Sequence, residues 1–148
     1  MTFTRTNSDN QDFQKLVEAL DIDLKIRDGE DNLFYAQFNK ITAIKHAIVA
    51  YDDDFPVGCG AIKQYADDTM EVKRMYVLPE KRGHGIAASI LSELENWAKE
   101  VDYTRCVLET GQKQLEAIAL YKKQGYQIIP NYGQYEGIAN SVCFEKIL

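Results

Sequence analysis

Hydrophobic residues along this chain follow two periods, and the change of period separates the expected helices from the expected strands. After a polar cluster at 7–10, apolar residues recur at helical spacing at positions 13, 16, 17, 20 and 24. A longer apolar stripe runs over 86–101, and a third helical segment covers 115–124 before Gly125. We expect three helices here and a polar loop at 27–32. The aromatic-rich residues 33–39 are expected to form a short helix or a covering loop.

Between the first two helices the apolar pattern changes to a period of two. Segments 44–51, 57–65 and 70–78 are separated by polar turns, which predicts an antiparallel meander of three strands. Residues 1–7 fit a short edge strand, and 105–109, 126–129 and 141–147 fit three further strands.

The strand at 70–78 has an irregular phase. Met70 and Val72 share one face, and Met75 and Val77 share a face, but the two pairs are out of phase. One extra residue near Lys73–Arg74 would bring both pairs onto one core, as a β-bulge does. The alternative is that one of these two cations covers an end of the sheet. A bulge would splay the strand and leave backbone groups ready to bind a ligand.

The segment Arg82-Gly83-His84-Gly85-Ile86-Ala87 joins this strand to the longest helix. Its glycines let the backbone approach a ligand closely. The helix start has no Ser, Thr, Asp or Asn cap, and its first turn carries no acid, so its N–H groups and Arg82 suit an external anion such as a pyrophosphate. A plain loop is the alternative for such a short motif.

Composition limits the class of protein and the kinds of molecule that it is expected to bind. The 45% hydrophobic and 27% charged content is that of a soluble globular protein, and we expect a single domain over 1–148. No apolar run reaches the roughly 18 residues of a membrane span, and no signal core is present. The net charge of −6 argues against a nucleic-acid partner. The three scattered cysteines predict buried free thiols in a reducing cytoplasm and no metal site.

Two common phosphate-binding motifs fit poorly. The chain lacks the Gly-x-x-x-x-Gly-Lys-Ser/Thr run of a P-loop. Residues 83–88 fit the dinucleotide fingerprint G-x-G-x-x-A, with Glu109 where a ribose-binding acid could lie. That fold needs successive βα units, however, whereas antiparallel hairpins precede this loop.

Two longer motifs are more specific. Residues 75–87, Met-Tyr-Val-Leu-Pro-Glu-Lys-Arg-Gly-His-Gly-Ile-Ala, resemble the acetyl-CoA motif of the GNAT superfamily of N-acetyltransferases, with Arg82, Gly85 and Ala87 in its three defined places. Residues 117–126 are similar to that family's second signature. The resemblance covers most of the second half of the chain. It implies an α/β (α+β) fold with a mixed, mostly antiparallel sheet of about six to seven strands flanked by helices, and a splayed strand pair that binds the cofactor.

The resemblance also implies how acetyl-CoA (coenzyme A) would bind as co-substrate, without a metal. The pantetheine arm would lie in the opening of the splayed strands, and the pyrophosphate would rest on the amides of the glycine loop. Gln114 stands where the family often has Asn. The expected cofactor-binding residues are Met75, Tyr76, Val77, Arg82, Gly83, His84, Gly85, Ile86, Ala87 and Gln114.

The family commonly uses a tyrosine at the place of Tyr121 as the acid for the leaving thiolate. Glu109 is our candidate for the base, with Glu71 as a weaker alternative. His84 is expected to contribute its backbone, and His46 to be structural. Residues 132–137 form an aromatic loop that either borders the acceptor site or simply connects two strands.

The expected function is transfer of an acetyl group from acetyl-CoA to a primary amine of a small molecule or peptide, by direct attack in a ternary complex. The alternative is a non-catalytic acyl-CoA-binding sensor or interaction module with the same fold. No membrane partner is expected, and a homodimer is open because such folds expose strand edges.

Overall fold

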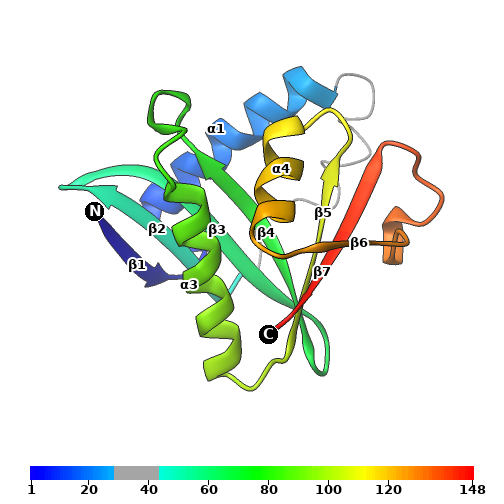
Figure 1. Ribbon diagram of the computed structural model, residues 1–148. Helices are drawn as coiled ribbons and strands as arrows, with labels where there is room; N and C mark the ends of the chain where they lie inside the picture. The colour runs from blue at the N-terminus through cyan, green and yellow to red at the C-terminus, as the bar shows by residue number, and fades with distance from the viewer. Residues whose placement is uncertain (29–43) are drawn as a thin grey trace.

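The computed structural model describes residues 1–28 and 44–148, whose strands form one seven-stranded sheet in the order β1-β2-β3-β4-β5-β7-β6 (Figure 1). Neighbouring strands pair antiparallel except β4 and β5, which are parallel. This confirms the expected mixed, mostly antiparallel fold. The strands are β1 (Thr2–Thr6), β2 (His46–Asp52), β3 (Phe55–Ala66), β4 (Thr69–Val77), β5 (Arg105–Gly111), β6 (Gln127–Ile129) and β7 (Ser141–Ile147).

The helices cover both faces of this sheet. They are α1 (Gln11–Asp28), α3 (Ile86–Glu100) and α4 (Leu115–Lys123), with short 3₁₀ turns η2 (Pro79–Lys81) and η3 (Gly133–Tyr135). The first helix includes residues 27 and 28, which we had expected in a loop, because no glycine or proline stops it before Gly29. The expected element at 33–39 lies outside the described residues.

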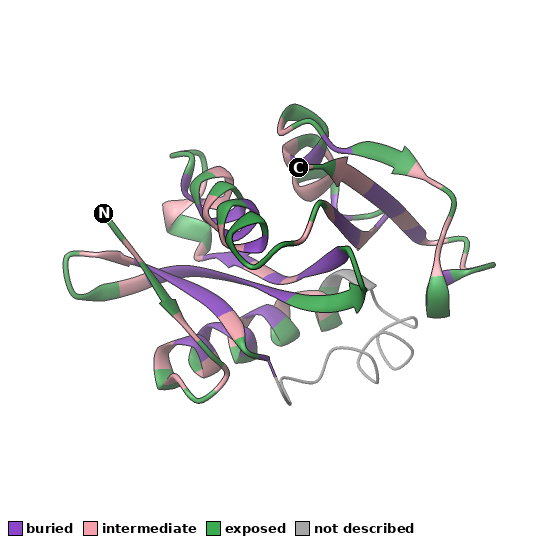
Figure 2. Ribbon diagram, turned by 90° about the horizontal axis from the view of Figure 1, so that it is seen from below, coloured by how far each residue is buried: buried purple, intermediate pink, exposed green. Residues whose placement is uncertain are grey.

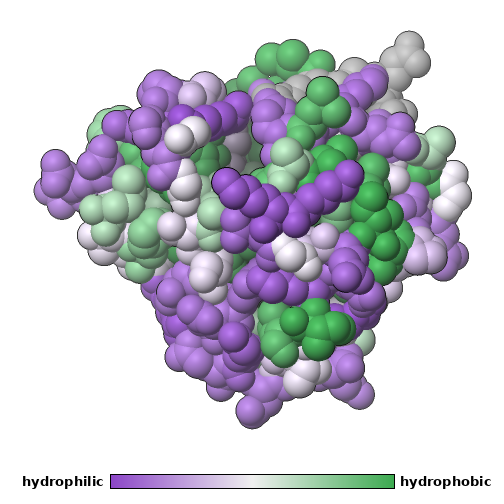
Figure 3. Space-filling model, viewed as in Figure 1, coloured by the Kyte–Doolittle hydropathy of each residue, from purple (hydrophilic) through white to green (hydrophobic). Residues whose placement is uncertain are grey.

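The central strands are largely buried (Figure 2). Their alternate residues belong to two separate cores. On β2, Ile48 and Ala50 pack in the core with α3, whereas Ala47 and Val49 pack in the core with α1. The three cysteines are buried and free, as expected. Figure 3 shows that the lower part of α3 is mainly hydrophilic, while apolar surface gathers between α1 and α4 and beside α4.

The expected bulge is present in β4. The register places Cys59 opposite Tyr76 but Ala61 opposite Lys73, so Arg74 and Met75 together face Gly60. Arg74 has a φ of 61°, in the left-handed region. The extra residue lets the pairs at 70/72 and 75/77 reach the same core beneath α3, as the phase of the sequence required.

The parallel pair β4–β5 splays apart soon after it begins. Pairing covers only Thr69–Arg105, Met70–Cys106 and Glu71–Val107. Beyond these residues β4 remains paired with β3, and β5 with β7. β5 therefore runs on to Gly111, two residues further than expected. An opening is left between the C-terminal halves of two central strands.

Candidate active site

Two adjoining cavities occupy the opening between β4 and β5. The larger, of about 430 Å³, extends toward the start of α3, and the smaller, of about 130 Å³, extends toward Glu71 and Glu109. They share five lining residues, Leu20, Met75, Gln114, Ala117 and Tyr121. A molecule in one cavity would therefore meet a molecule in the other at these residues.

The larger cavity begins at the open end of α3. Gly85 is the N-cap residue, with a φ of 78°, and no side chain in the described part of the chain caps the helix. Gly83 also has a positive φ, of 83°, and a Cβ at either glycine would meet no other atom within 4 Å. The Arg82 Nε donates a hydrogen bond to the Val77 carbonyl oxygen over 2.9 Å, which anchors the loop to the end of β4. The backbone N–H groups in the first turn of α3 and the Arg82 guanidinium together fit a diphosphate.

The expected cofactor residues gather at this cavity, with one exception. All of them line it except His84, whose side chain is exposed in the loop. Met75 and Gln114 line the smaller cavity as well. The side chain of His84 thus has no part in the cavity wall.

Tyr121 stands in the wall between the two cavities. It is held by the end of α4, where the N–H of Tyr126 bonds the Tyr121 carbonyl over 2.9 Å and Gly125 takes a φ of 92°. Its ring packs against Tyr126 and Phe144, and only 6% of the residue is exposed. Burial, and then the negative charge of Glu109, raise the pKa of Tyr121. The phenol is therefore protonated at neutral pH and can donate a hydrogen bond.

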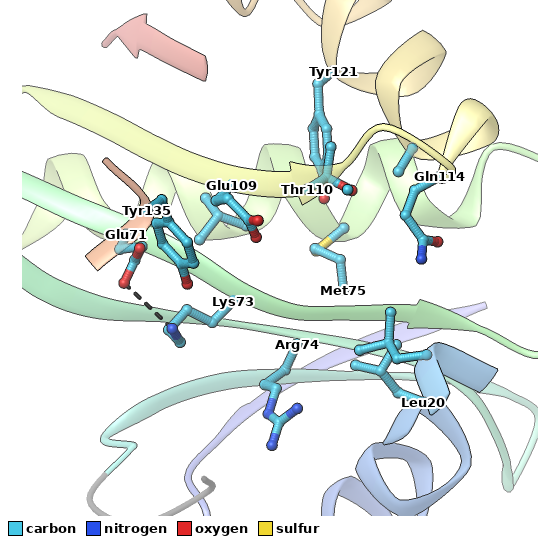
Figure 4. A pocket seen from close by; sticks show the side chains of 14 residues that line it. Leu20, Glu71, Lys73, Arg74, Met75, Glu109, Thr110, Gln114, Tyr121 and Tyr135 are labelled. Atoms are coloured by element: carbon cyan, nitrogen blue, oxygen red, sulfur yellow. Dashed lines mark hydrogen bonds and ion pairs between the residues drawn. The ribbon is translucent and has the colours of Figure 1, made fainter. Parts of the chain in front are cut away.

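The smaller cavity is lined by both acids and bases (Figure 4). Tyr121 extends from α4 toward Met75, and Glu109 lies between Tyr121 and the Glu71–Lys73 pair. The Glu71 Oε1 is 3.4 Å from the Lys73 Nζ. Glu109 accepts a hydrogen bond from the Ser141 hydroxyl over 2.7 Å. Both candidate bases thus face the same small space.

The loop before β7 closes the far end of the smaller cavity. Tyr132 donates a 2.5 Å hydrogen bond to Glu71 Oε2, and its ring packs edge-on against Tyr65 and Tyr135. Burial, followed by the charge of Glu71, raises the pKa of Tyr132. Tyr135 is part of the lining, so the loop at 132–137 borders the smaller cavity.

Sequence reasoning missed the roles of Lys73 and Arg74 as cavity residues. It treated them only as the place of a bulge or as cover for the sheet. The signal was available in part, because a bulge turns its extra residue out of the regular alternation and toward the opening. The partner of Arg74 could not have been found, since Asp21 is distant in the chain, whereas Lys73 pairs with Glu71 on its own strand.

Other candidate chemistry lies outside these cavities. His46 begins β2 and packs edge-on against Trp97, at 4.6 Å between ring centroids, which is consistent with a structural role. Within residues 1–28 and 44–148, no three His, Cys, Asp or Glu residues come together in a way that could hold a metal ion. No helix in the described part of the chain is both long and apolar enough to cross a membrane.

Comparison with known proteins agrees with this geometry. The model of the acetyltransferase (GNAT) family matches residues 13–126. An IAA acetyltransferase of Azospirillum brasilense is 40% identical over 105 residues, which cover 68% of this chain and 67% of that protein. A crystal structure from Klebsiella pneumoniae, described as an acyl-CoA N-acyltransferase, superimposes with a TM-score of 0.83 at 30% identity, covering 99% of this chain and 97% of the other.

More distant structures share the fold at lower identity. One is the PaiA N-acetyltransferase of Thermoplasma acidophilum in complex with coenzyme A, with a TM-score of 0.71 at 19% identity over the full length of both chains. The family model alone covers more than half of this chain. The chain is therefore an acyltransferase of the GNAT superfamily of N-acetyltransferases.

Proposed function

We propose that this enzyme transfers the acetyl group of acetyl-CoA to a primary amine within a ternary complex. The observation that carries the proposal is the position of Tyr121 in the shared wall of two cavities, one headed by an open helix end and the other lined by two carboxylates. Coenzyme A in the PaiA neighbour and acetyl-CoA in a streptothricin acetyltransferase-type neighbour from Bacillus anthracis support this choice of donor.

The larger cavity is the proposed donor site. The amides of the loop from Arg82 to Ala87 would hold the diphosphate, and the backbone of Met75 to Val77 would bond the pantetheine arm, with Gln114 beside it. A bulge followed by a splayed strand leaves backbone groups available for such bonds. When bound, the donor supplies an activated acetyl thioester. No metal takes part in the proposal.

The smaller cavity is the proposed acceptor site. The amine must lose a proton before its lone pair can attack, and the Glu109 carboxylate is the proposed proton acceptor, directly or through one water. Glu71 is the second candidate, although Tyr132 and Lys73 already bond its two oxygens. In the transfer a carbon–nitrogen bond forms and the carbon–sulfur bond breaks. Tyr121 Oη holds the proton that stabilises or neutralises the departing sulfur.

Donor binding can be tested with two matched glycine variants. Gly85 and Gly137 both have positive φ and open space around them, but only Gly85 lines the larger cavity. A Cβ strains either backbone by about 1–2 kcal/mol. We expect Gly85→Ala to weaken acetyl-CoA binding about tenfold in isothermal titration, and Gly137→Ala to leave it unchanged. Absence of acetyl-CoA binding by the native protein at millimolar concentration would refute the proposal.

Turnover separates the enzyme from a non-catalytic acyl-CoA sensor. Release of free thiol from acetyl-CoA should depend on an added amine, and mass spectrometry should find the acetylated amine. Tight binding of acetyl-CoA with no thiol release from a broad amine panel would favour the sensor instead.

A further inference from the structure

The two cations of the smaller cavity are unusually buried. The side chains of Lys73 and Arg74 are 11% and 3% exposed. In the other ion pairs found within residues 1–28 and 44–148, the cation is 30–36% exposed. Lysine and arginine are seldom buried without a specific partner. Two adjacent buried cations in a protein of net charge −6 therefore call for a local explanation.

The partners within the protein leave the cations only partly satisfied. The Arg74 Nη1 is 2.8 Å from Asp21 Oδ1 on α1, but Asp21 is itself half exposed. The Arg74 Nε is buried and has no hydrogen-bond partner within residues 1–28 and 44–148. The Lys73 Nζ lies 3.4 Å from Glu71 Oε1, a long contact, and Tyr132 bonds the other oxygen of Glu71. Buried charged donors without full pairing are costly unless a ligand completes them.

The backbone does not explain an arginine at position 74. This residue has the left-handed φ of 61° at the bulge, where glycine is unstrained and an arginine is not. Strain of this kind is characteristic of functional sites. Arg74 is nonetheless part of the cavity lining, and its side chain is buried.

We propose that the acceptor is a small amino carboxylate, whose carboxylate is bound by Arg74 and Lys73 while its amine faces Glu109 and Tyr121. This inference rests on the proposed acetyl transfer and names its substrate class. Arg74 lies on the α1 side of β4, and Glu109 and Tyr121 lie on the opposite side of the cavity (Figure 4). The cavity thus carries Arg74 on its α1 side and Lys73 beside Glu71, with Glu109 between that pair and Tyr121. Its volume of about 130 Å³ suits a small molecule.

Paired acceptors provide the test, since each pair shares an amine and differs in one carboxylate. We compare β-alanine with propylamine and each standard L-amino acid with its decarboxylated amine, by thiol release, with kcat/KM corrected for the fraction of free amine. For at least one pair the amino carboxylate should be preferred about 10- to 100-fold, as expected for a charge-assisted hydrogen bond. Titration of the same pairs into the protein saturated with coenzyme A gives a second readout, independent of turnover.

Variants that remove a positive charge test whether Arg74 and Lys73 cause the preference for the amino carboxylate. Arg74→Met and Lys73→Met should each reduce the ratio within a preferred pair at least fivefold, mainly through KM, without changing acetyl-CoA affinity. Arg105→Met is the matched control, because it removes an arginine paired with Glu145 outside the cavity, and its ratio should equal that of the native protein. If thermal unfolding shows that Arg74→Met is not folded, Lys73→Met alone tests whether the buried cations cause the carboxylate preference.

The failures of the two proposals are distinguishable. If the native enzyme binds acetyl-CoA and acetylates amines but shows no carboxylate preference, or if neither variant changes that preference, the amino carboxylate inference is wrong and the proposed activity stands. If acetyl-CoA does not bind at all, both are overturned.

Discussion

Tyr121→Phe is the sharpest test of the proposed chemistry, because it removes one oxygen and leaves the packing of the ring in place. The ring contacts of Tyr121 with Tyr126 and Phe144, at centroid distances of 5.8 and 5.9 Å, do not involve the hydroxyl. The free energy of unfolding should therefore change by less than about 1 kcal/mol. The donor cavity keeps its shape, so the affinity for acetyl-CoA should stay within about twofold.

The expected loss of turnover follows from burial. A hydrogen bond to a charged group contributes about 1.5–3 kcal/mol, and the shielded position of Tyr121 favours the upper part of that range. Since about 1.4 kcal/mol corresponds to a factor of ten, kcat should fall about 100-fold. Because the pKa of Tyr121 is raised, the native enzyme should not lose this group to ionisation below pH 10.

Thiol release under saturating substrates measures kcat, isothermal titration measures donor affinity, and urea unfolding measures stability. A variant that is folded, binds acetyl-CoA normally and keeps kcat within threefold of the native value would remove Tyr121 from the chemistry.

Three further predictions concern the base, the bulge and the buried thiols. Glu109→Gln should lower kcat at least 100-fold, and Ser141→Ala, which removes the hydroxyl that hydrogen-bonds that carboxylate, by less than tenfold; equal effects in a thiol-release assay would argue against Glu109 as the base. Gly60→Ala should cost about 1–3 kcal/mol in urea unfolding, because its Cβ would lie 2.5 Å from the Met75 Sδ and 2.8 Å from Ile90, and an unchanged midpoint would contradict this packing. Burial raises the pKa of Cys59 to about 12, so the thiol ionises in the unfolded chain before it does in the folded one; this thiol should lower stability by up to ~1.4 kcal/mol per pH unit between about pH 9 and 12, and Cys59→Ala should remove that part of the slope.

Local sequence patterns were sufficient to predict most of the backbone features around the site. The phase slip between Val72 and Met75 located the bulge, because a regular strand cannot bring both residues to one core and one extra residue can. The uncapped helix start at Gly85 and the closing glycine after α4 were likewise visible as local backbone signals.

Contacts between residues distant in the sequence could not be predicted in this way. The hydrogen bond from Tyr132 to Glu71 and the ion pair of Arg74 with Asp21 each join separate elements, and no periodicity records them. These same contacts determine the charge distribution of the smaller cavity. The sequence therefore indicated the donor much more clearly than the acceptor.

The short parallel junction divides the sheet into two independently bonded parts. Strands β1 to β4 form one antiparallel ladder, and β5, β7 and β6 form another; three residue pairs, the apolar core beneath α3 and the hydrogen bond from Tyr132 to Glu71 are among the contacts that join them. A ligand in the opening would contact both parts, and its binding free energy would therefore stabilise their association. Saturation of the opening should therefore slow amide hydrogen exchange along β5 as well as in the glycine loop, which couples the rigidity of the whole sheet to occupancy of its site.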